Sequence, residues 1–357
     1  MFVNPEIKRI ILLNFGGIGD EILFFPVIQV LRECFPLSKI IMVVEPRSAE
    51  VVLRNFFIDE VYEFDIKSNL TLADLTNFVS FIRNNFPDII ISSGSSNLIP
   101  FLLFLSGAKI RIGYKTSKWS FLHTNAVELN TNQYASFMYS DLLKGLGFKG
   151  KAPIPNLFIP QIALEWACDL FESLGIPNDR NTLLIHPGVS KLSKQKGIIK
   201  SWDPKRWIEL IKKLSKENLN IVLAGSEDDK EDLEIIYKEV SDYVFYIYNK
   251  YKTITQLAAI IKISDLLLCV DSAPMHLAVA LDKPLIALFG PTDEKKLLPP
   301  NSFQFTAIKA EVDCRPCLWD IRKKCCEKKD CLNKIEVDNV YKSIMSKIGL
   351  KTFNEYI

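Results

Sequence analysis

The segment with the clearest chemical potential lies near the amino terminus, at residues 14–20 (NFGGIGD). It follows a short apolar run, and Gly17 and Gly19 let the backbone turn tightly and approach a ligand closely. Asp20 stands at the expected start of a helix, where its carboxylate either caps the helix or serves in catalysis. The dinucleotide-binding fingerprint requires a third glycine where this chain has Ile22, so a nicotinamide cofactor is not indicated.

A second candidate segment, residues 186–190 (HPGVS), follows another apolar run and contains His186 and Gly188. No acidic residue lies between positions 181 and 202. Four lysines follow the segment: Lys191, Lys194, Lys196 and Lys200. Because ammonium groups beside a turn attract polyphosphates, this stretch indicates a phosphate-binding loop. A solvated, charged surface loop is the alternative interpretation.

Two more turns in the second half of the chain combine polar side chains with a preceding apolar run. One leads into an apolar helix and contains the candidates Asp271, Ser272, Ala273, Met275 and His276. Free N–H groups at such a helix start can hold a phosphate, although Asp271 and Ser272 are also common helix caps. The other turn places Thr292 after a Gly-Pro pair, and it can equally be only a turn.

A region without acidic residues extends over residues 89–127 and mixes basic with aromatic side chains. The basic residues are Lys109, Arg111, Lys115, Lys118 and His123, and the aromatic residues among them are Tyr114, Trp119 and Phe121. This composition suits an anionic substrate or an anionic membrane surface. Local depletion of acids also arises by chance, and that interpretation stays open.

Five of the eight cysteines fall within 18 residues near the carboxyl end. Four thiolates can form a tetrahedral site for zinc or iron. The expected ligands are Cys314, Cys317, Cys325 and Cys331, with Cys326 as the alternative to Cys325. Because the spacing after the first pair is irregular, reduced thiols without a metal are the other interpretation.

Short apolar runs alternate with amphipathic segments in both halves of the chain. This pattern indicates two α/β domains with parallel, doubly wound sheets. Expected strands lie at 9–14, 39–44, 61–64, 88–92, 109–113, 182–186, 220–224, 244–248, 265–270 and 284–289. A proline-rich connection at 151–160 separates a domain at 1–158 from one at 159–335. We expect a final helix at 336–357 to pack back toward the first domain.

Composition narrows the functional class. The 357 residues include 44 Lys and Arg against 42 Asp and Glu, and this near balance gives no support to a dedicated nucleic-acid binder. The most apolar stretch, LIPFLLFL at 98–105, is too short to span a bilayer. We therefore expect a cytoplasmic protein, and any membrane contact would be peripheral.

Taken in order, these segments resemble glycosyltransferase family 9, the ADP-heptose lipopolysaccharide heptosyltransferases. The motifs that carry the resemblance are GGIGD (16–20) with Pro26 on the next helix, RIGY (111–114), IHPG (185–188), KSW (200–202), DSAPMHLAVAL (271–281) and FGPT (289–292). They span about residues 8–335. Ala273 stands where the family usually has glycine, which changes how closely the backbone can approach the nucleotide.

The resemblance implies a GT-B fold, in which two Rossmann-like domains face a central cleft. It also implies an inverting transfer from ADP-heptose to a lipopolysaccharide inner-core acceptor or another anionic glycolipid. Asp20 matches the family's catalytic base. Acceptor binding would fall on Gly17, Gly19, Lys109, Arg111 and Lys115, and nucleotide-sugar binding on His186, Gly188, Lys200, Glu227, Asp271, Ser272, Ala273, Met275, His276 and Thr292. No cofactor is implied for catalysis.

Three other functions remain open at this stage. The first is transfer of the heptose to a protein, such as an autotransporter. The cysteine cluster adds some support to it, because the cluster resembles the iron site of protein-heptosylating relatives; the cluster itself is interpreted as structural. A nucleotide-sugar epimerase of the same fold would need no acceptor. A scaffold on the membrane surface would have no need of Asp20 or of the phosphate-site motifs.

Overall fold

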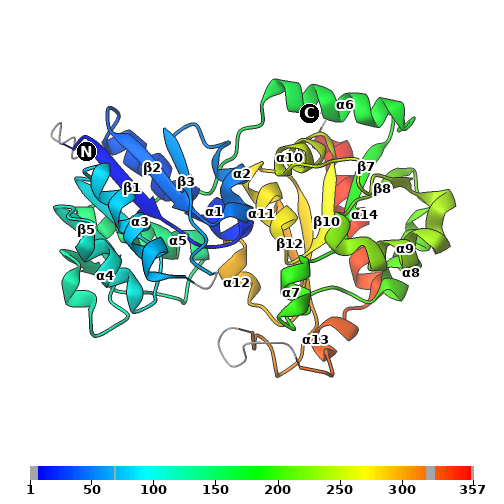
Figure 1. Ribbon diagram of the computed structural model, residues 1–357. Helices are drawn as coiled ribbons and strands as arrows, with labels where there is room; N and C mark the ends of the chain where they lie inside the picture. The colour runs from blue at the N-terminus through cyan, green and yellow to red at the C-terminus, as the bar shows by residue number, and fades with distance from the viewer. Residues whose placement is uncertain (1–6, 68–69, 319–325, 355–357) are drawn as a thin grey trace. The chain divides into compact units, whose positions relative to one another are not determined.

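The computed structural model describes residues 7–67, 70–318 and 326–354. The chain divides into two compact units, residues 1–158 and 159–357, and the division falls in the proline-rich connection. Each unit contains a sheet of six parallel strands with helices on its faces (Figure 1). The prediction of two doubly wound α/β domains is therefore confirmed.

The first unit is built on a sheet with the strand order β3-β2-β1-β4-β5-β6. The strands are β1 (Arg9–Leu13), β2 (Lys39–Val44), β3 (Glu60–Glu63), β4 (Ile89–Ser92), β5 (Ile110–Tyr114) and β6 (Asn125–Val127). The helices are α1 (Ile18–Cys34), α2 (Ala49–Val52), α3 (Leu72–Asn84), α4 (Leu98–Leu105) and α5 (Ala135–Ser140), with short 3-10 turns at Pro46–Ser48, Ser120–Leu122 and Asp141–Leu146.

Continuous apolar runs form the central strands of this unit because helices cover both faces of the sheet. Ile11 of β1 lies opposite Ile41 of β2 on one side and Ile90 of β4 on the other, and all three are fully buried. Helices α3 and α4 pack on one face, where Phe78 and Leu103 join the core. Helices α2 and α5 pack beside α1.

The second unit has the strand order β12-β11-β10-β7-β8-β9. Its strands are β7 (Asn181–His186), β8 (Leu219–Leu223), β9 (Phe245–Tyr246), β10 (Leu266–Val270), β11 (Leu285–Phe289) and β12 (Phe305–Lys309). Its helices are α6 (Gln161–Ser173), α7 (Lys191–Gln195), α8 (Pro204–Leu214), α9 (Lys230–Val240), α10 (Ile254–Ile263), α11 (Ala273–Ala280), α12 (Glu294–Leu297), α13 (Asp330–Asn333) and α14 (Val337–Asn354), with 3-10 turns at Glu227–Asp229 and Ser241–Tyr243.

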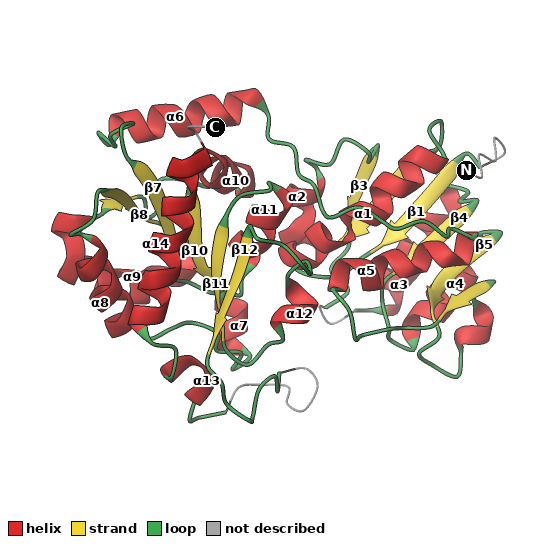
Figure 2. Cartoon of the chain, turned by 180° about the vertical axis from the view of Figure 1, so that it is seen from behind, coloured by secondary structure: helices red, strands yellow, loops and turns green. Residues whose placement is uncertain are grey.

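Two groups of helices cover this second sheet (Figure 2). Helices α8, α9 and α14 share one hydrophobic core with the strands, while α6 and α11 pack against α10. The expected final helix is present as α14, and its residues Val340, Ile344 and Ile348 belong to the core of the second unit. The Tyr341 hydroxyl also donates to Glu217 over 2.6 Å. Packing of the helix toward the first domain stays a prediction.

The strand order places a topological switch point in each unit. In the first sheet the chain leaves β1 for β2 on one side and returns to β4 on the other, and in the second sheet β7 stands between β8 and β10. Open α/β sheets bind ligands beyond the carboxyl ends of the strands at such points. No helix in the described part of the chain has the length and apolarity needed to cross a bilayer.

Candidate active site

Asp20 lies at the switch point of the first unit, in the first turn of α1. Gly17 is the N-cap of α1, and Asp20 stands three residues further on, where its Oδ2 atom accepts the Gly17 backbone N–H over 2.8 Å. Asp20 therefore supports the helix start without being the N-cap itself. The other oxygen, Oδ1, accepts the hydroxyl of Tyr139 from α5 over 3.2 Å. Each oxygen keeps a further lone pair, so the cap leaves this half-buried carboxylate able to accept a proton.

The glycine loop before Asp20 is tightly packed at one position and open at the next. A Cβ on Gly16 would lie 2.2 Å from the Cβ of Asp20, which excludes any other residue there without a shift of the backbone. A Cβ on Gly17 would meet nothing closer than 3.8 Å, so the backbone at this helix start has space beside it. Gly19 lies within the first turn of α1.

Polar side chains hold this loop in place through hydrogen bonds. The Asn14 amide donates to the Asp20 carbonyl over 3.3 Å and to Glu21 over 3.1 Å, and the Ser93 hydroxyl donates to Asn14 over 2.6 Å. Asn14 belongs to the predicted segment but had no role assigned to it, and sequence reasoning missed Glu21, Ser93 and Tyr139. The one available signal was a carboxylate, Glu21, beginning the otherwise apolar run EILFFPV.

Glu21 is fully buried, and its Oε1 atom has no hydrogen-bond partner among the described residues. Burial, followed by the negative charge of Asp20, raises the pKa of Glu21 well above its usual value. Glu21 therefore keeps its proton at pH values at which an exposed glutamate is ionised. This arrangement keeps a second negative charge away from the candidate base.

Replacement of Glu21 by glutamine is expected to stabilise the protein at alkaline pH. The unfolded chain releases the Glu21 proton near pH 4.3, whereas the folded protein retains it, so wild-type stability falls as pH rises above that value. Glutamine has no proton to lose. In thermal melts at pH 8 we expect the variant to have a Tm about 2–4 °C higher than that of wild type, because a stabilisation of roughly 1 kcal/mol shifts Tm by that amount. At pH 5 the difference should be smaller. An equal difference at both pH values would show that Glu21 is ionised in the folded protein.

A charged cluster at the end of β2 is a further feature that sequence reasoning missed. The buried Glu45 carboxylate pairs with Arg47 over 2.5 Å and with Lys67 over 3.0 Å. A Cβ built on Gly17 would lie 3.8 Å from the Arg47 guanidinium, which places this cation next to the glycine loop. Two cations share one carboxylate here, so the cluster is suited to an anionic ligand beside Asp20.

The predicted acceptor-binding cations lie apart from this loop, except for Lys115. Lys109 precedes β5 and Arg111 is its second residue, so both lie toward the amino end of the strand, whereas Asp20 lies beyond the carboxyl ends of the parallel strands. The Arg111 guanidinium donates to the carbonyls of Leu122 and Ala108. Lys115 follows β5 at the carboxyl edge and pairs with the exposed Glu128.

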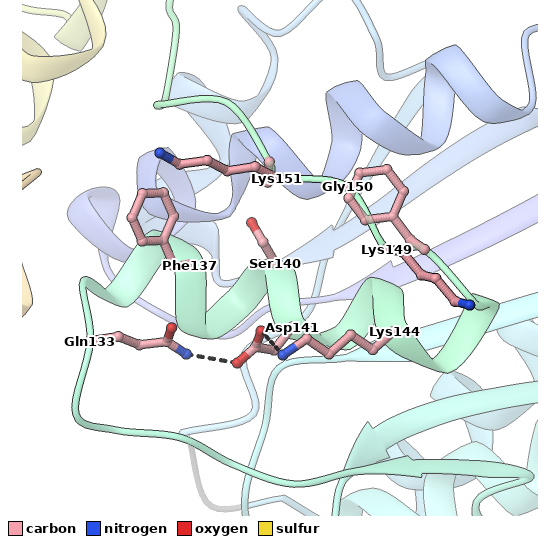
Figure 3. Close-up of a pocket in the computed structure, with 10 residues that line it drawn as sticks. Gln133, Phe137, Ser140, Asp141, Lys144, Lys149, Gly150 and Lys151 are labelled. Carbon is pink, nitrogen blue, oxygen red and sulfur yellow. Dashed lines mark hydrogen bonds and ion pairs between the residues drawn. The ribbon is translucent and has the colours of Figure 1, made fainter. Parts of the chain in front are cut away.

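A pocket of about 350 Å³ opens on the first unit beside α5 (Figure 3). The residues labelled around it are Gln133, Phe137, Ser140, Asp141, Lys144, Lys149, Gly150 and Lys151. The Asp141 carboxylate already has partners in the pocket, because Gln133 donates a hydrogen bond to it over 2.7 Å and Lys144 pairs with it over 2.6 Å. None of the predicted site residues lines this pocket, so it does not mark the predicted site.

In the second unit, Asp271 lies at the switch point, directly after β10. The fully buried carboxylate pairs with the Lys200 ammonium over 3.1 Å and accepts the Thr292 hydroxyl over 2.7 Å. Burial alone would raise the pKa of Asp271, but the charge of Lys200 and the hydrogen bond from Thr292 outweigh it, and the pKa lies below its usual value. Three predicted residues from distant parts of the chain are thereby brought together.

Helix α11 begins beside this ion pair without a side-chain cap. The Ser272 hydroxyl donates back to the Val270 carbonyl over 3.2 Å instead of accepting from the helix. Ala273 occupies the first helical position and is partly exposed, so its N–H group is available to an anion. Met275 and His276 follow in the same helix and are buried, at 0% and 6% exposure, and His276 lies close enough to Asp271 to contribute to the lowering of its pKa.

His186 and Gly188 lie at the end of β7, next to Asp229. A Cβ on Gly188 would fall 1.8 Å from the Asp229 Oδ1 atom, so only glycine fits. Burial lowers the pKa of His186, although the charge of Asp229 opposes the shift, and the ring is neutral at pH 7. The ring nitrogen Nε2 lies 3.4 Å from the Tyr251 hydroxyl.

The remaining predicted residues of this unit are more exposed. Glu227 follows β8 and accepts hydrogen bonds from Tyr248 and Asn249, which lower its pKa and hold it as a carboxylate at the sheet edge. Of the predicted lysine run, Lys194 pairs with Asp232 over 2.9 Å. That lysine fits the interpretation as a solvated surface loop, whereas Lys200 fits the phosphate-site interpretation.

The cysteine cluster is only partly within the described residues. Cys317 and Cys331 are buried and Cys314 is exposed, while Cys325 lies outside the described residues. Among the side chains that the structure does describe, no three His, Cys, Asp or Glu groups are arranged to hold a metal ion. The metal therefore stays a prediction from the spacing of the cysteines.

Comparison with known proteins identifies a family of similar sequences. The sequence model of glycosyltransferase family 9 (heptosyltransferase) matches residues 80–329. Lipopolysaccharide heptosyltransferase 3 of Escherichia coli is 27% identical over 286 residues, which cover 77% of this chain and 81% of that protein.

Two solved structures share the fold. The E. coli ADP-heptose lps heptosyltransferase II aligns over 97% of this chain and 100% of its own, with a TM-score of 0.76 and 18% identity. An E. coli heptosyltransferase solved with ADP-2-deoxy-2-fluoro heptose aligns over 95% and 99%, with a TM-score of 0.70 and 18% identity. Because the family model covers well over half of the sequence, this chain belongs to glycosyltransferase family 9, the heptosyltransferases, and is a glycosyltransferase.

Proposed function

We propose that the protein transfers a heptose from ADP-heptose to a lipopolysaccharide inner-core acceptor, with inversion at the anomeric carbon. The observation that carries the proposal is the carboxylate of Asp20, which is held at a switch point by the Gly17 N–H and the Tyr139 hydroxyl. The donor is favoured by one similar structure that is named for ADP-heptose and by another that contains an ADP-sugar. The acceptor is favoured by relatives named for lipopolysaccharide.

In the proposed reaction, Asp20 takes the proton from the acceptor hydroxyl as its oxygen attacks the anomeric carbon. The new carbon–oxygen bond forms as the bond to the diphosphate breaks, so ADP leaves with the bonding electrons and Asp20 holds the proton. Burial and the adjacent Asp20 charge raise the pKa of Tyr139 well above its usual value, so the tyrosine stays a hydrogen-bond donor. It orients the carboxylate and does not exchange the proton.

We propose that Lys200 and the uncapped start of α11 stabilise the negative charge on the departing diphosphate. Asp271, which accepts the Thr292 hydroxyl, holds Lys200 in place, and the N–H of Ala273 adds a second donor beside it. Glu227, kept ionised by Tyr248 and Asn249, is suited to accept hydrogen bonds from ribose hydroxyls. No cofactor takes part in this chemistry.

For the acceptor we propose an anionic glycolipid whose phosphate or carboxylate groups meet the Arg47 and Lys67 cluster beside the glycine loop. Lys115, at the same edge of the sheet, extends this basic surface. A lipid-linked acceptor also calls for peripheral contact with the cytoplasmic face of the inner membrane. Under this proposal a delipidated core oligosaccharide is still a substrate, whereas an autotransporter protein is not.

Calorimetric titration with ADP, UDP, GDP and CDP tests the proposed donor site. We expect ADP to bind at least tenfold more tightly than the other three, because the diphosphate contacts are shared and only the base differs. Preference for UDP would overturn the donor assignment while leaving the family intact. Glu227→Gln is expected to weaken ADP by about fivefold, in line with loss of one charged hydrogen bond.

We propose further that the cysteine cluster binds one structural zinc or iron ion, on the grounds of its spacing. Elemental analysis of protein purified without added metal is expected to give about one ion per chain. Cys331→Ser should remove the ion and lower Tm, because a structural metal contributes directly to folding. Cys168→Ser, an exposed cysteine outside the cluster, is the matched control and should retain the metal. Wild-type protein with less than a tenth of an ion per chain would overturn the proposal.

A further inference from the structure

Helix α4 of the first unit is apolar on every side, with the sequence LIPFLLFL. Its inner side chains, Ile99, Leu102 and Leu103, pack in the core with α3 and the sheet. Its outer side chains are exposed: Leu98, Phe101, Phe104 and Leu105. A helix that is hydrophobic all round is ordinarily enclosed on all sides, so the outer face of α4 lacks the covering that its sequence predicts.

The segment after β5 extends this apolar surface. The Trp119 ring lies 4.8 Å from the Phe101 ring and 5.9 Å from the Phe121 ring, centroid to centroid, tilted against both, and Phe121 is 71% exposed. We define the α4 patch as Leu98, Phe101, Phe104, Leu105, Trp119 and Phe121. Its three phenylalanines alone expose on the order of 300 Å². With the leucines added, the patch reaches the size that usually marks an interaction site on a single chain.

Basic side chains surround the patch, and acidic ones are missing from its segments. The Arg111 guanidinium lies 5.7 Å from the Phe104 ring centre, and the Lys118 ammonium lies 5.3 Å from that of Trp119. Lys109 and Lys118 are both exposed. No acidic residue occurs from 89 to 127, and the next one, Glu128, forms an ion pair with Lys115. The patch therefore combines exposed aromatic rings with a net positive edge.

We propose that the α4 patch docks the protein onto the surface of an anionic lipid bilayer. Phe104 and Phe121 enter the boundary between headgroups and acyl chains, and Lys118 contacts lipid phosphates. Aromatic and leucine side chains with flanking Lys and Arg are the composition of helices that lie in a membrane interface. A second copy of the chain is disfavoured as the occupant, because pairing two such patches would bring their positive edges together. The reason for docking, access to a lipid-linked acceptor, rests on the proposed function; the binding itself does not.

Sedimentation with vesicles tests the inference directly. The full-length protein is mixed with vesicles of phosphatidylcholine alone or with 30% phosphatidylglycerol, and the bound fraction is measured. We expect at least fivefold tighter binding to the anionic vesicles. The Phe104→Ser, Phe121→Ser double variant should bind anionic vesicles at least tenfold more weakly. Both rings are exposed to water in the free protein and become buried only when the protein binds the membrane. Lys118→Gln should lose about fivefold, the effect of one charge near the surface.

Matched controls separate this inference from the proposed function. Phe303, which is 99% exposed on the second unit, is replaced by serine and should bind vesicles as wild type does. All variants should retain the wild-type Tm and the wild-type rate with a delipidated acceptor. Equal binding to neutral and anionic vesicles, unchanged binding by the double variant, or a dimer that the double variant converts to a monomer would each overturn the inference. Absence of transfer with intact vesicle binding would instead overturn the proposed function alone.

Discussion

Replacement of Asp20 by asparagine is expected to lower kcat by about 10³-fold while changing the affinity for ADP by less than twofold. Asparagine keeps an oxygen that can accept the Gly17 N–H, so the helix cap and the loop are retained. It cannot take a proton from the acceptor hydroxyl, and a general base contributes roughly 10²–10⁴-fold to rate. Initial rates of ADP release, together with calorimetric titration of ADP, measure the two quantities.

The chain supplies a control for the capping role of Asp20. Asp74 caps α3 in the same way, because its Oδ2 atom accepts the Thr71 N–H over 2.8 Å, the same distance as for Asp20. Asp74 is exposed and lies away from the switch point. If Asp20 only caps α1, the two asparagine variants should behave alike, with near-normal turnover. A rate loss confined to Asp20→Asn would assign the catalytic role to that carboxylate.

The second large effect is expected at Lys200. Lys200→Gln should lower kcat/KM for the sugar nucleotide by about 10²-fold, because it removes a positive charge next to the departing diphosphate. The variant keeps a hydrogen-bond donor for Asp271 but removes the ion pair of 3.1 Å. Steady-state kinetics with varied donor at saturating acceptor measure the change. Equal kinetics for wild type and variant would remove Lys200 from the donor site.

The same substitution should also lower stability at neutral pH, with a smaller effect at acid pH. In the wild type, Lys200 and Thr292 hold the pKa of Asp271 below its usual value, so the ion pair adds stability above about pH 4 that is lost as pH falls further. Lys200→Gln loses this contribution, and its Tm should fall below wild type most clearly at neutral pH. Lys309→Gln is the matched control, because Lys309 also pairs with a carboxylate, Glu294, over 2.7 Å. It should lower Tm without lowering kcat/KM.

The fold could be predicted from sequence because the central strands are continuous apolar runs, and such runs form buried parallel strands. The strands that escaped prediction are at the sheet edges. β6 has three residues, Asn125–Val127, two of them exposed, and every residue of β12, Phe305–Lys309, is only partly buried. Edge strands bury less apolar surface, so their sequences carry a weaker pattern. Helix α4 was not predicted either, because an apolar run of eight residues has no polar positions to reveal the 3.6-residue period of a helix.

The site was predictable where a motif places residues next to one another and not where the fold joins distant ones. The loop from Gly17 to Asp20 could be seen in the sequence as a glycine-rich turn before a helix. Tyr139 could not, because it lies 119 residues from Asp20 and meets it only through the packing of α5 beside α1. Arg111 shows the opposite case: a basic residue in a matching motif whose guanidinium is bound to backbone carbonyls.

The measurement that tests the central claim most directly is transfer to a defined acceptor. The protein is incubated with ADP-heptose and a delipidated, heptose-deficient lipopolysaccharide core, and the acceptor and the nucleotide are followed by mass spectrometry and chromatography. We predict that each acceptor gains one heptose as one ADP is released, and that Asp20→Asn abolishes both. Conversion of the sugar nucleotide without an acceptor, or heptose appearing on an autotransporter protein and not on the core, would contradict the account.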